Sequence, residues 1–190
     1  MPTIVTHAFI PVVVGKTVTD KKMPLRFWIL GIFCSVLADA DVISFNLGIE
    51  YGAFFGHRGF FHSLCFAFIL STVVAILAFR KMGIFSKRWC LIWSFFFLIN
   101  ASHGVLDMFT DGGLGIALFS PFDTTRYFFP WRPLRVSPIG IGRLFSVSAN
   151  AALISEIIWI WLPLTAILVI RDRYKKVRRK TNSQPNTGNK

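Results

Sequence analysis

Histidines and acidic residues interrupt stretches of this sequence that are otherwise apolar. The stretch "SHGVLDMFTDGG" ends a long apolar run and carries His103, Asp107 and Asp111, and "ADADV" carries Asp39 and Asp41. Helical residues four apart lie on one face, so His103 and Asp107 can reach a common ion. Imidazole and carboxylate ligands without cysteine suit zinc first and manganese or iron second. The chemistry that these residues favour is therefore metal binding.

Two further histidines, His57 and His62, bracket the sequence "RGFF". Two ligands five residues apart usually need an interruption of regular secondary structure between them, and Gly59 could supply it. "ADADV", on a helix end or an extended turn, can offer one carboxylate to each of two metals. A bound ion would lower the pKa of water to about 7 and create hydroxide for attack on an ester or phosphoester.

The composition is that of a membrane protein. Of the 190 residues, 54% are hydrophobic and 16% aromatic, which is too apolar for a soluble domain. The net charge of +12 comes from basic residues in short clusters between apolar runs, as in membrane loops, so no nucleic-acid partner is expected. The amino terminus lacks a basic start and a small-residue cleavage site, so we expect no cleavable signal peptide.

Four apolar runs approach the length of about 20 residues that a membrane helix needs. They are residues 25–45, 60–79, 89–109 and 151–170. A run from Ile4 to Val14 is too short to span alone and contains Pro11, so we expect an interfacial, re-entrant or partly buried helix there, split at the proline. The predicted fold is an all-α polytopic membrane bundle of about four transmembrane helices plus this short N-terminal helix. Residues 1–170 form the membrane-embedded domain, and residues 171–190 form a basic, polar tail.

Clusters of lysine and arginine predict the orientation of the bundle. They precede the first span, fill the turn between the second and third, and follow the fourth, so alternating spans place all three on one side. The positive-inside rule makes that side cytoplasmic, with the C-terminus. The opposite side then receives all four histidines, if the amino terminus starts there, and at least four acids. Ionisable groups at membrane depth are costly unless they are paired, wetted or metal-bound.

Several arginines lie on the predicted outer side, where the positive-inside rule makes basic residues less common. Guanidinium groups favour phosphate, so Arg58 and Arg126 are candidates to bind an anionic group of a substrate, although outer lipid headgroups would also account for them. The basic tail is expected to contact anionic membrane lipid.

Other readings of individual residues stay open. His103 alone could be a polar contact between helices, and His7 could be an interfacial histidine. Asp111 and Asp123 could be solvated loop acids or turn-forming residues. Glu156, about two turns inside the last span, could pair with an arginine or belong to the site.

In their order along the chain, "TH", "ADADV", "HRGFFHS", "SHGVLDMFTDGG" and "SPFDTTRYFFPWRPLRVSP" resemble the YdjM-type family of bacterial inner-membrane proteins, for which membrane-bound metal-dependent hydrolase activity is inferred. The resemblance covers about residues 3–170. That family is grouped with zinc-dependent phospholipase C and P1-type nucleases, whose sites use a helical His-x-x-x-Asp, here His103 and Asp107. The resemblance implies a hydrolase of phosphoester or lipid-like substrates in the inner membrane. It implies as ligands His7, Asp39 or Asp41, His57, His62, His103 and Asp107.

The first hypothesis is thus a membrane hydrolase with one or more zinc-class ions at the outer end of the bundle. A carboxylate among Asp39, Asp41 and Asp107 that is not consumed as a ligand would serve as general base. The alternatives are a proton-coupled transporter, which predicts functional polar groups through the whole membrane thickness, and a structural or partner-binding membrane protein, which predicts no tight metal. The sequence does not define the oligomeric state.

Overall fold

The computed structural model describes residues 1–138 and 146–182, and in these ranges the chain is helical with no strand. Four helical segments are long and apolar enough to cross a membrane, which confirms the predicted all-α fold. They are Leu25–Asn46, Leu64–Met82, Lys87–Asp107 and Val147–Arg179. A shorter apolar helix precedes them, as expected.

Several of the segments are built from consecutive helical pieces. The short N-terminal helix is α1 (Ile4–Val18). The first span joins α2 (Leu25–Leu37), a 3₁₀ turn (Ala38–Val42) and α3 (Ile43–Asn46). The second follows a 3₁₀ turn (Phe60–His62) and joins α4 (Leu64–Phe79) to another 3₁₀ turn (Arg80–Met82), and the third is α5 (Lys87–Asp107). The fourth joins α6 (Val147–Glu156), a π-helical turn (Ile157–Trp161) and α7 (Leu162–Asn182).

Hydroxyl side chains begin four of these helices. Thr3, Ser63, Ser86 and Ser146 each accept a hydrogen bond from the backbone N–H three residues later, at the starts of α1, α4, α5 and α6. Such caps satisfy backbone donors that the first turn leaves free. Each helix start is therefore specified by the sequence.

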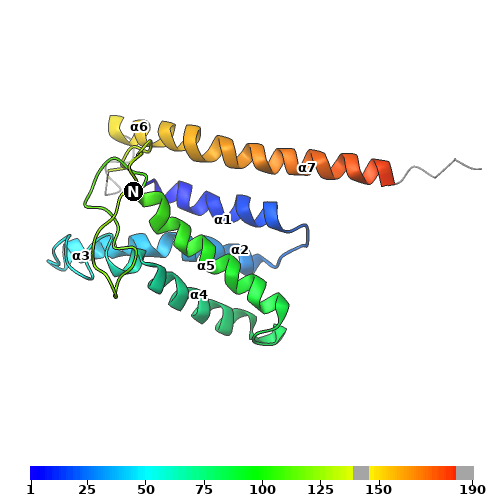
Figure 1. The fold of residues 1–190 in the computed structure, drawn as a ribbon, viewed down its shortest axis with the longest axis horizontal. Helices are drawn as coiled ribbons and strands as arrows, with labels where there is room; N and C mark the ends of the chain where they lie inside the picture. Colours follow the sequence, from blue (N-terminus) through cyan, green and yellow to red (C-terminus); the bar gives the residue numbers. More distant parts are fainter. Residues whose placement is uncertain (139–145, 183–190) are drawn as a thin grey trace, which may run out of the picture.

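Helix α1 packs along α2 and α7 within the bundle (Figure 1). The expected split at Pro11 is wrong, because α1 runs without interruption through that proline. A proline at position 11 cannot donate to the carbonyl of His7, and the Ser35 hydroxyl of α2 donates to that carbonyl instead, at 2.5 Å. At Gly31 of α2 an added Cβ would lie 3.3 Å from the Cβ of Pro11, so the absence of a side chain there allows the close approach of the two helices.

Aromatic residues of α2, α4 and α5 form the centre of the hydrophobic core. Phe79 and Phe96 are fully buried, and the rings of Phe27 and Phe95 stack with centroids 4.5 Å apart. The fourth span by contrast is mostly exposed, since only 11% of its most apolar 18-residue stretch is buried. Helix α7 also extends beyond the rest of the bundle (Figure 1). The core thus holds α2, α4 and α5 together, while α7 joins mainly through α1.

The two ends of the bundle differ in what covers them (Figure 1). One end carries the turn between α1 and α2, the turn between α4 and α5, and the basic part of α7, so the three basic clusters share an end. The other end carries the N-terminus, α3 and the long connection that follows α5. That connection pairs with the segment that leads into α4, since Ala117 N–H donates to Arg58 O and Leu64 N–H donates to Leu118 O.

Candidate metal centre

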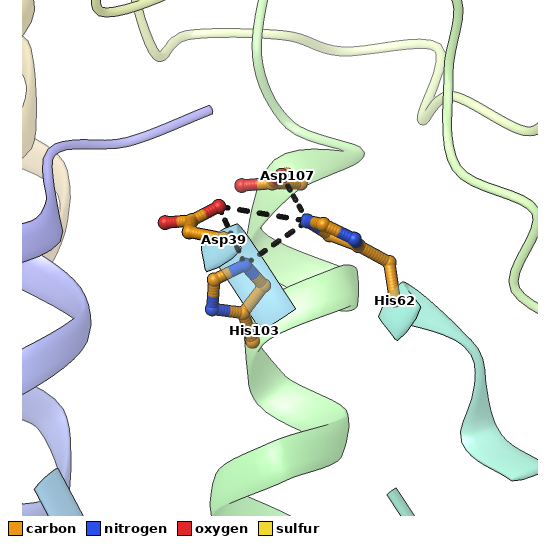
Figure 2. Close-up of side chains that lie close together, drawn as sticks. All are labelled: Asp39, His62, His103 and Asp107. Atoms are coloured by element: carbon orange, nitrogen blue, oxygen red, sulfur yellow. Dashed lines mark hydrogen bonds and ion pairs between the residues drawn. The ribbon is translucent and has the colours of Figure 1, made fainter. Parts of the chain in front are cut away.

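Four buried side chains meet at the end of the bundle that carries the N-terminus (Figure 2). Asp39 comes from the 3₁₀ turn after α2, His62 from the turn before α4, and His103 and Asp107 from α5. The Nε2 atoms of His103 and His62 lie 3.2 Å apart. Asp39 Oδ1 lies 3.2 Å from His103 Nε2 and 3.6 Å from His62 Nε2, and Asp107 Oδ2 lies 3.5 Å from His62 Nε2. We call these four residues the cluster.

Local structure explains how each side chain reaches the cluster. His103 and Asp107 are four residues apart on α5 and face the same way, as the sequence predicts. The turn that carries His62 packs directly on α5 at Gly104, where an added Cβ would lie only 2.4 Å from the backbone oxygen of His62. Glycine at position 104 therefore allows His62 to approach His103.

The ring of His103 is oriented by a backbone carbonyl. Its Nδ1 lies 2.7 Å from the carbonyl oxygen of Ser35, which can only accept a hydrogen bond, so Nδ1 carries the proton. In the neutral ring, Nε2 is then left with a free lone pair that points into the cluster. Ser35 thus binds α1 through its hydroxyl and orients His103 through its carbonyl.

The ring of His62 faces a carboxylate, without the aligned hydrogen bond that orients His103. Its Nδ1 lies 3.1 Å from Asp41 Oδ2, while its Nε2 faces the cluster. Burial by itself would lower the pKa of His62, but the carboxylates of Asp39 and Asp41 outweigh it and raise the pKa to about 9. A histidine whose second nitrogen faces a carboxylate or carbonyl is the usual arrangement around protein-bound metal ions.

The donor set fits a divalent cation. Two imidazole nitrogens and two carboxylate oxygens lie within 4.8 Å of one another, and all four residues are buried. In a tetrahedral zinc site the ligand atoms lie about 2.0–2.1 Å from the ion and hence about 3.3 Å from each other. The facing pairs in the cluster, at 3.2–3.6 Å, have nearly that spacing. Asp39 Oδ2 and both oxygens of Asp107 have no hydrogen-bond partner, which is costly for buried carboxylates unless a cation is bound.

Asp41 and His57, both predicted as ligands, lie next to the cluster and do not join its four donors. Asp41 Oδ1 lies 2.6 Å from His57 Nδ1, and Asp41 Oδ2 accepts from the Arg58 backbone N–H at 3.0 Å. Because Asp39 and Asp41 are two residues apart on a 3₁₀ turn, their side chains leave it in different directions. Asp39 contacts His103, and Asp41 contacts the turn that carries His57 and His62.

His7, the remaining predicted ligand, borders the cluster from α1. It is fully buried, its ring stacks on His103 with centroids 3.8 Å apart, and its Nε2 lies 3.5 Å from Asp107 Oδ1. Neither of its ring nitrogens has a hydrogen-bond partner.

The two arginines predicted to bind substrate both donate to the protein. Arg58 is buried, with a left-handed φ of 64°, and donates to the Gly112 carbonyl at 2.6 Å and the Thr110 hydroxyl at 3.1 Å. Its Nε lies 3.7 Å from Asp107 Oδ2. Arg126 donates to the backbone carbonyls of Tyr51 at 2.9 Å and His57 at 3.1 Å, and it lines a small surface pocket beside these loops.

The acids left open by the sequence have structural partners. Asp111 lies beyond the end of α5 and binds the Arg135 side chain at 2.9 Å and the Val136 N–H at 2.8 Å. Asp123 accepts from the Tyr127 hydroxyl at 2.5 Å. Glu156 is fully buried and binds the start of α1, where it accepts from Thr3 N–H at 2.7 Å and from the Thr6 hydroxyl. Glu156 therefore pairs with a helix N-terminus, which favours negative charge.

Sequence reasoning missed Ser35, Gly104 and the role of Glu156. The available signal for Ser35 was Pro11, because a proline inside a helix frees a carbonyl that another group must satisfy. For Gly104 it was a glycine beside a histidine in the middle of a helix, which often marks a close approach of another backbone.

Comparison with known proteins agrees with the membrane fold. A family model described as YdjM inner membrane protein matches residues 1–176. The chain is 38% identical over 163 residues to "Inner membrane protein YbcI" of Escherichia coli (strain K12), which covers 86% of this chain and 92% of that protein. No solved structure matches. The extent of both matches, together with four apolar helices suited to multi-pass insertion, shows that the chain belongs to the YdjM family of inner membrane proteins.

Proposed function

We propose that this protein is a membrane-bound hydrolase that depends on a divalent metal ion, zinc being the best fit. The observation that carries the proposal is the orientation of the two cluster histidines. His103 Nδ1 donates to a carbonyl and His62 Nδ1 faces a carboxylate. The two Nε2 atoms therefore point at each other and at Asp39, and that of His62 also faces Asp107. At most one proton can lie between the two nitrogens, whereas one metal ion would satisfy all four groups at once.

Asp39, His62, His103 and Asp107 would hold the ion. When bound, such an ion supplies a Lewis acid and a water nucleophile at neutral pH. The charge of Asp41 would favour the His62 tautomer with its proton on Nδ1, which leaves Nε2 free, and the hydrogen bond to the Ser35 carbonyl would fix the same tautomer of His103. The positive charge of Arg58, whose Nε faces the Asp107 carboxylate, would stabilise the ionised form of Asp107.

A phosphoester or lipid-like substrate is proposed from the charge around the site. In the described residues, the Arg126 side chain contacts backbone carbonyls and the ring face of Tyr51, so no ion pair with a carboxylate neutralises its positive charge there. Guanidinium groups recognise phosphate well. The position of the cluster at a bundle end would give access to lipid headgroups.

A proton-coupled transporter is less well supported. It requires functional polar groups through the membrane thickness. In the described ranges, the buried histidines and charged side chains all lie at the cluster end or at the start of α1. They are His7, Asp39, Asp41, His57, Arg58, His62, His103, Asp107 and Glu156.

The decisive experiment is metal analysis of the protein purified in detergent without chelators. We expect stoichiometric transition metal in the wild type and its loss in His103→Ala and in His62→Ala. Asn100→Ala is the matched control, because Asn100 is a buried polar residue one turn earlier on α5 that bonds to Ser71 and not to the cluster. A wild-type protein without stoichiometric metal, or variants that keep it, would refute the metal site. If metal is present, a panel of phosphodiesters and phospholipids with chelator controls tests the hydrolase.

We also propose that the cluster faces outward and the basic end faces the cytoplasm. In a background without Cys34, Cys65 and Cys90, an impermeant maleimide should label Phe122→Cys in intact spheroplasts and Lys176→Cys only after lysis. Phe122 is 90% exposed in the connection at the cluster end, and Lys176 is exposed on α7. The reverse labelling pattern would overturn the orientation and leave the metal site unaffected.

A further inference from the structure

A small surface pocket lies at the cluster end, between the segment that leads into α4 and the connection that follows α5. Gly52, Phe54 and Gly59 line it from the first segment, and Ser120 and Arg126 line it from the second. Its volume of about 270 Å³ is just below the range of about 300–1,000 Å³ that small-molecule sites usually have. The pocket therefore has room for one compact chemical group rather than for a whole lipid.

Backbone carbonyls hold the guanidinium of Arg126 in place at this pocket. Its Nη2 donates to the carbonyls of Tyr51 at 2.9 Å and Ala53 at 3.4 Å. Its Nη1 donates to those of His57 at 3.1 Å and Gly115 at 3.4 Å. These bonds use the two terminal nitrogens, which leaves the Nε–H for a ligand. A guanidinium fixed in this way loses little freedom when it binds an anion.

The acidic side chains nearest to the pocket are engaged by other groups. Asp123 accepts from the backbone N–H of Thr125 at 2.8 Å and from the Tyr127 hydroxyl at 2.5 Å. Asp41 contacts the ring of His57 at 2.6 Å, whereas the carbonyl of His57 accepts from Arg126. Within the described ranges no carboxylate lines the pocket, so the charge that it offers a ligand is positive.

A buried hydroxyl in the pocket has no partner. Ser120 is 1% exposed, and its Oγ makes no hydrogen bond to the described part of the chain. A buried hydroxyl without a partner is costly, and an oxygen of a ligand would satisfy it. A guanidinium beside a free hydroxyl suits phosphate, whose oxygens accept several charge-assisted hydrogen bonds.

Exposed aromatic side chains lie around the opening of the pocket. Phe54 lines it, Phe119 and Phe122 flank Ser120 in the sequence, and all three rings are exposed. Aromatic residues of membrane proteins gather at the level of the lipid headgroups. These rings could contact the apolar part of a ligand whose charged group occupies the pocket.

We propose that this pocket binds the phosphate group of a lipid-like phosphate ester, with the apolar part of the ligand against the exposed phenylalanines. The pocket adjoins the cluster, because Gly59 in its wall precedes His62 by three residues. The inference deepens the proposed function and rests on it in treating this lipid as the substrate. The binding itself involves Arg126 and Ser120 and needs no metal ion.

The test is native mass spectrometry of ligand binding to the detergent-solubilised protein. The probes are dihexanoyl phosphatidate, dihexanoylglycerol, which lacks the phosphate, and inorganic phosphate, which lacks the chains. We expect the wild type to bind the phosphatidate at least about tenfold more tightly than either other probe, since a hydrogen bond to a charged group is worth about one such factor. This preference should persist in chelator.

Two variants locate the binding while Arg126 and its carbonyl contacts stay in place. Ser120→Ala should weaken phosphatidate binding about 3–10-fold through the lost hydrogen bond. Gly52→Phe should block the pocket and weaken binding at least about tenfold. An added Cβ at Gly52 has no atom within 4 Å, so the larger side chain is tolerated. Arg135→Gln is the charge control and should bind as the wild type, because Arg135 is exposed and pairs with Asp111.

Each contrary outcome overturns a defined part of the proposal. Equal binding of dihexanoylglycerol would exclude phosphate recognition, and equal binding of inorganic phosphate would exclude a lipid ligand. Unchanged binding in Gly52→Phe, or loss of binding in chelator, would place the ligand outside the pocket. A protein without metal that still binds phosphatidate in the pocket would refute the proposed hydrolase and leave this site standing.

Discussion

The two ends of this bundle both gather ionisable side chains, but in opposite surroundings. At the cluster end, Asp39, His62, His103 and Asp107 are 0–6% exposed, and carboxylate oxygens of one segment face imidazole nitrogens of another. At the basic end, Asp20 binds Arg171 at 2.7 Å and also Lys175, with the Asp20 side chain 54% exposed. The cluster is therefore shielded from solvent, whereas the ion pairs of Asp20 are exposed to it.

The difference shows which positions need a fixed geometry. Removing one member of a buried set leaves its partners charged and without water, so each side chain depends on the others. Exposed ion pairs contribute little to stability, because water and salt replace either partner. We therefore expect the basic end to matter through its total charge, which sets orientation, and the cluster end through the position of each atom.

The largest effect is expected from removing the metal. If the cluster binds an ion, the wild type should be less stable in chelator than in excess metal. With free metal at about 100–1,000 times the dissociation constant, the difference in the free energy of unfolding should be about 3–4 kcal/mol. Unfolding of the detergent-solubilised protein, with and without chelator, measures this. In Asp107→Ala the chelator should have no effect, and an equal effect in both proteins would contradict binding at the cluster.

A substitution at Gly104 should disrupt the cluster without changing any of its ligands. In Gly104→Ala the added Cβ must displace the turn that carries His62, because its nearest neighbour is a backbone oxygen at 2.4 Å. Such overpacking costs about 1–3 kcal/mol even though alanine favours a helix. Unfolding and metal titration measure the loss. Ser94→Ala on the same helix is the control, and unchanged metal affinity in Gly104→Ala would show that the approach of His62 is not required.

Asp41→Asn should weaken metal binding while the four cluster residues stay in place. The change removes the charge that faces His62 Nδ1 at 3.1 Å. Residues that orient a metal-binding histidine typically contribute about 10–100-fold in affinity. Competitive titration against a fluorescent chelator measures the constant, with Asp123→Asn as the surface control. Complete loss of metal would instead indicate that Asp41 is itself a ligand.

The smallest effect is expected at the basic end. Asp20→Asn removes the negative charge that binds Arg171 and Lys175, but water can solvate both basic groups after the change. Neither the unfolding midpoint nor the metal content should change measurably. A clear loss of stability in Asp20→Asn would mean that the exposed ion pairs at the basic end contribute more to stability than their exposure predicts.

Much of the fold was predictable from the sequence because the relevant signals are local. Length and hydropathy of the apolar runs define the four spans, and the hydroxyl caps Ser63 and Ser86 mark two helix starts. The spacing of four between His103 and Asp107 places both on one helical face wherever α5 lies. The distribution of basic residues likewise identifies one end of the bundle without any knowledge of how the helices pack.

The membership of the cluster, by contrast, was decided by tertiary contacts. Nothing in "ADADV" tells which aspartate faces His103, since the answer depends on how the 3₁₀ turn is oriented against α5 and the turn of His62. Pro11 frees a carbonyl, but only the packing of α1 on α2 brings Ser35 to it. Composition and spacing act along the chain, whereas the direction of a buried side chain is determined by the groups that replace its water, and these come from other segments.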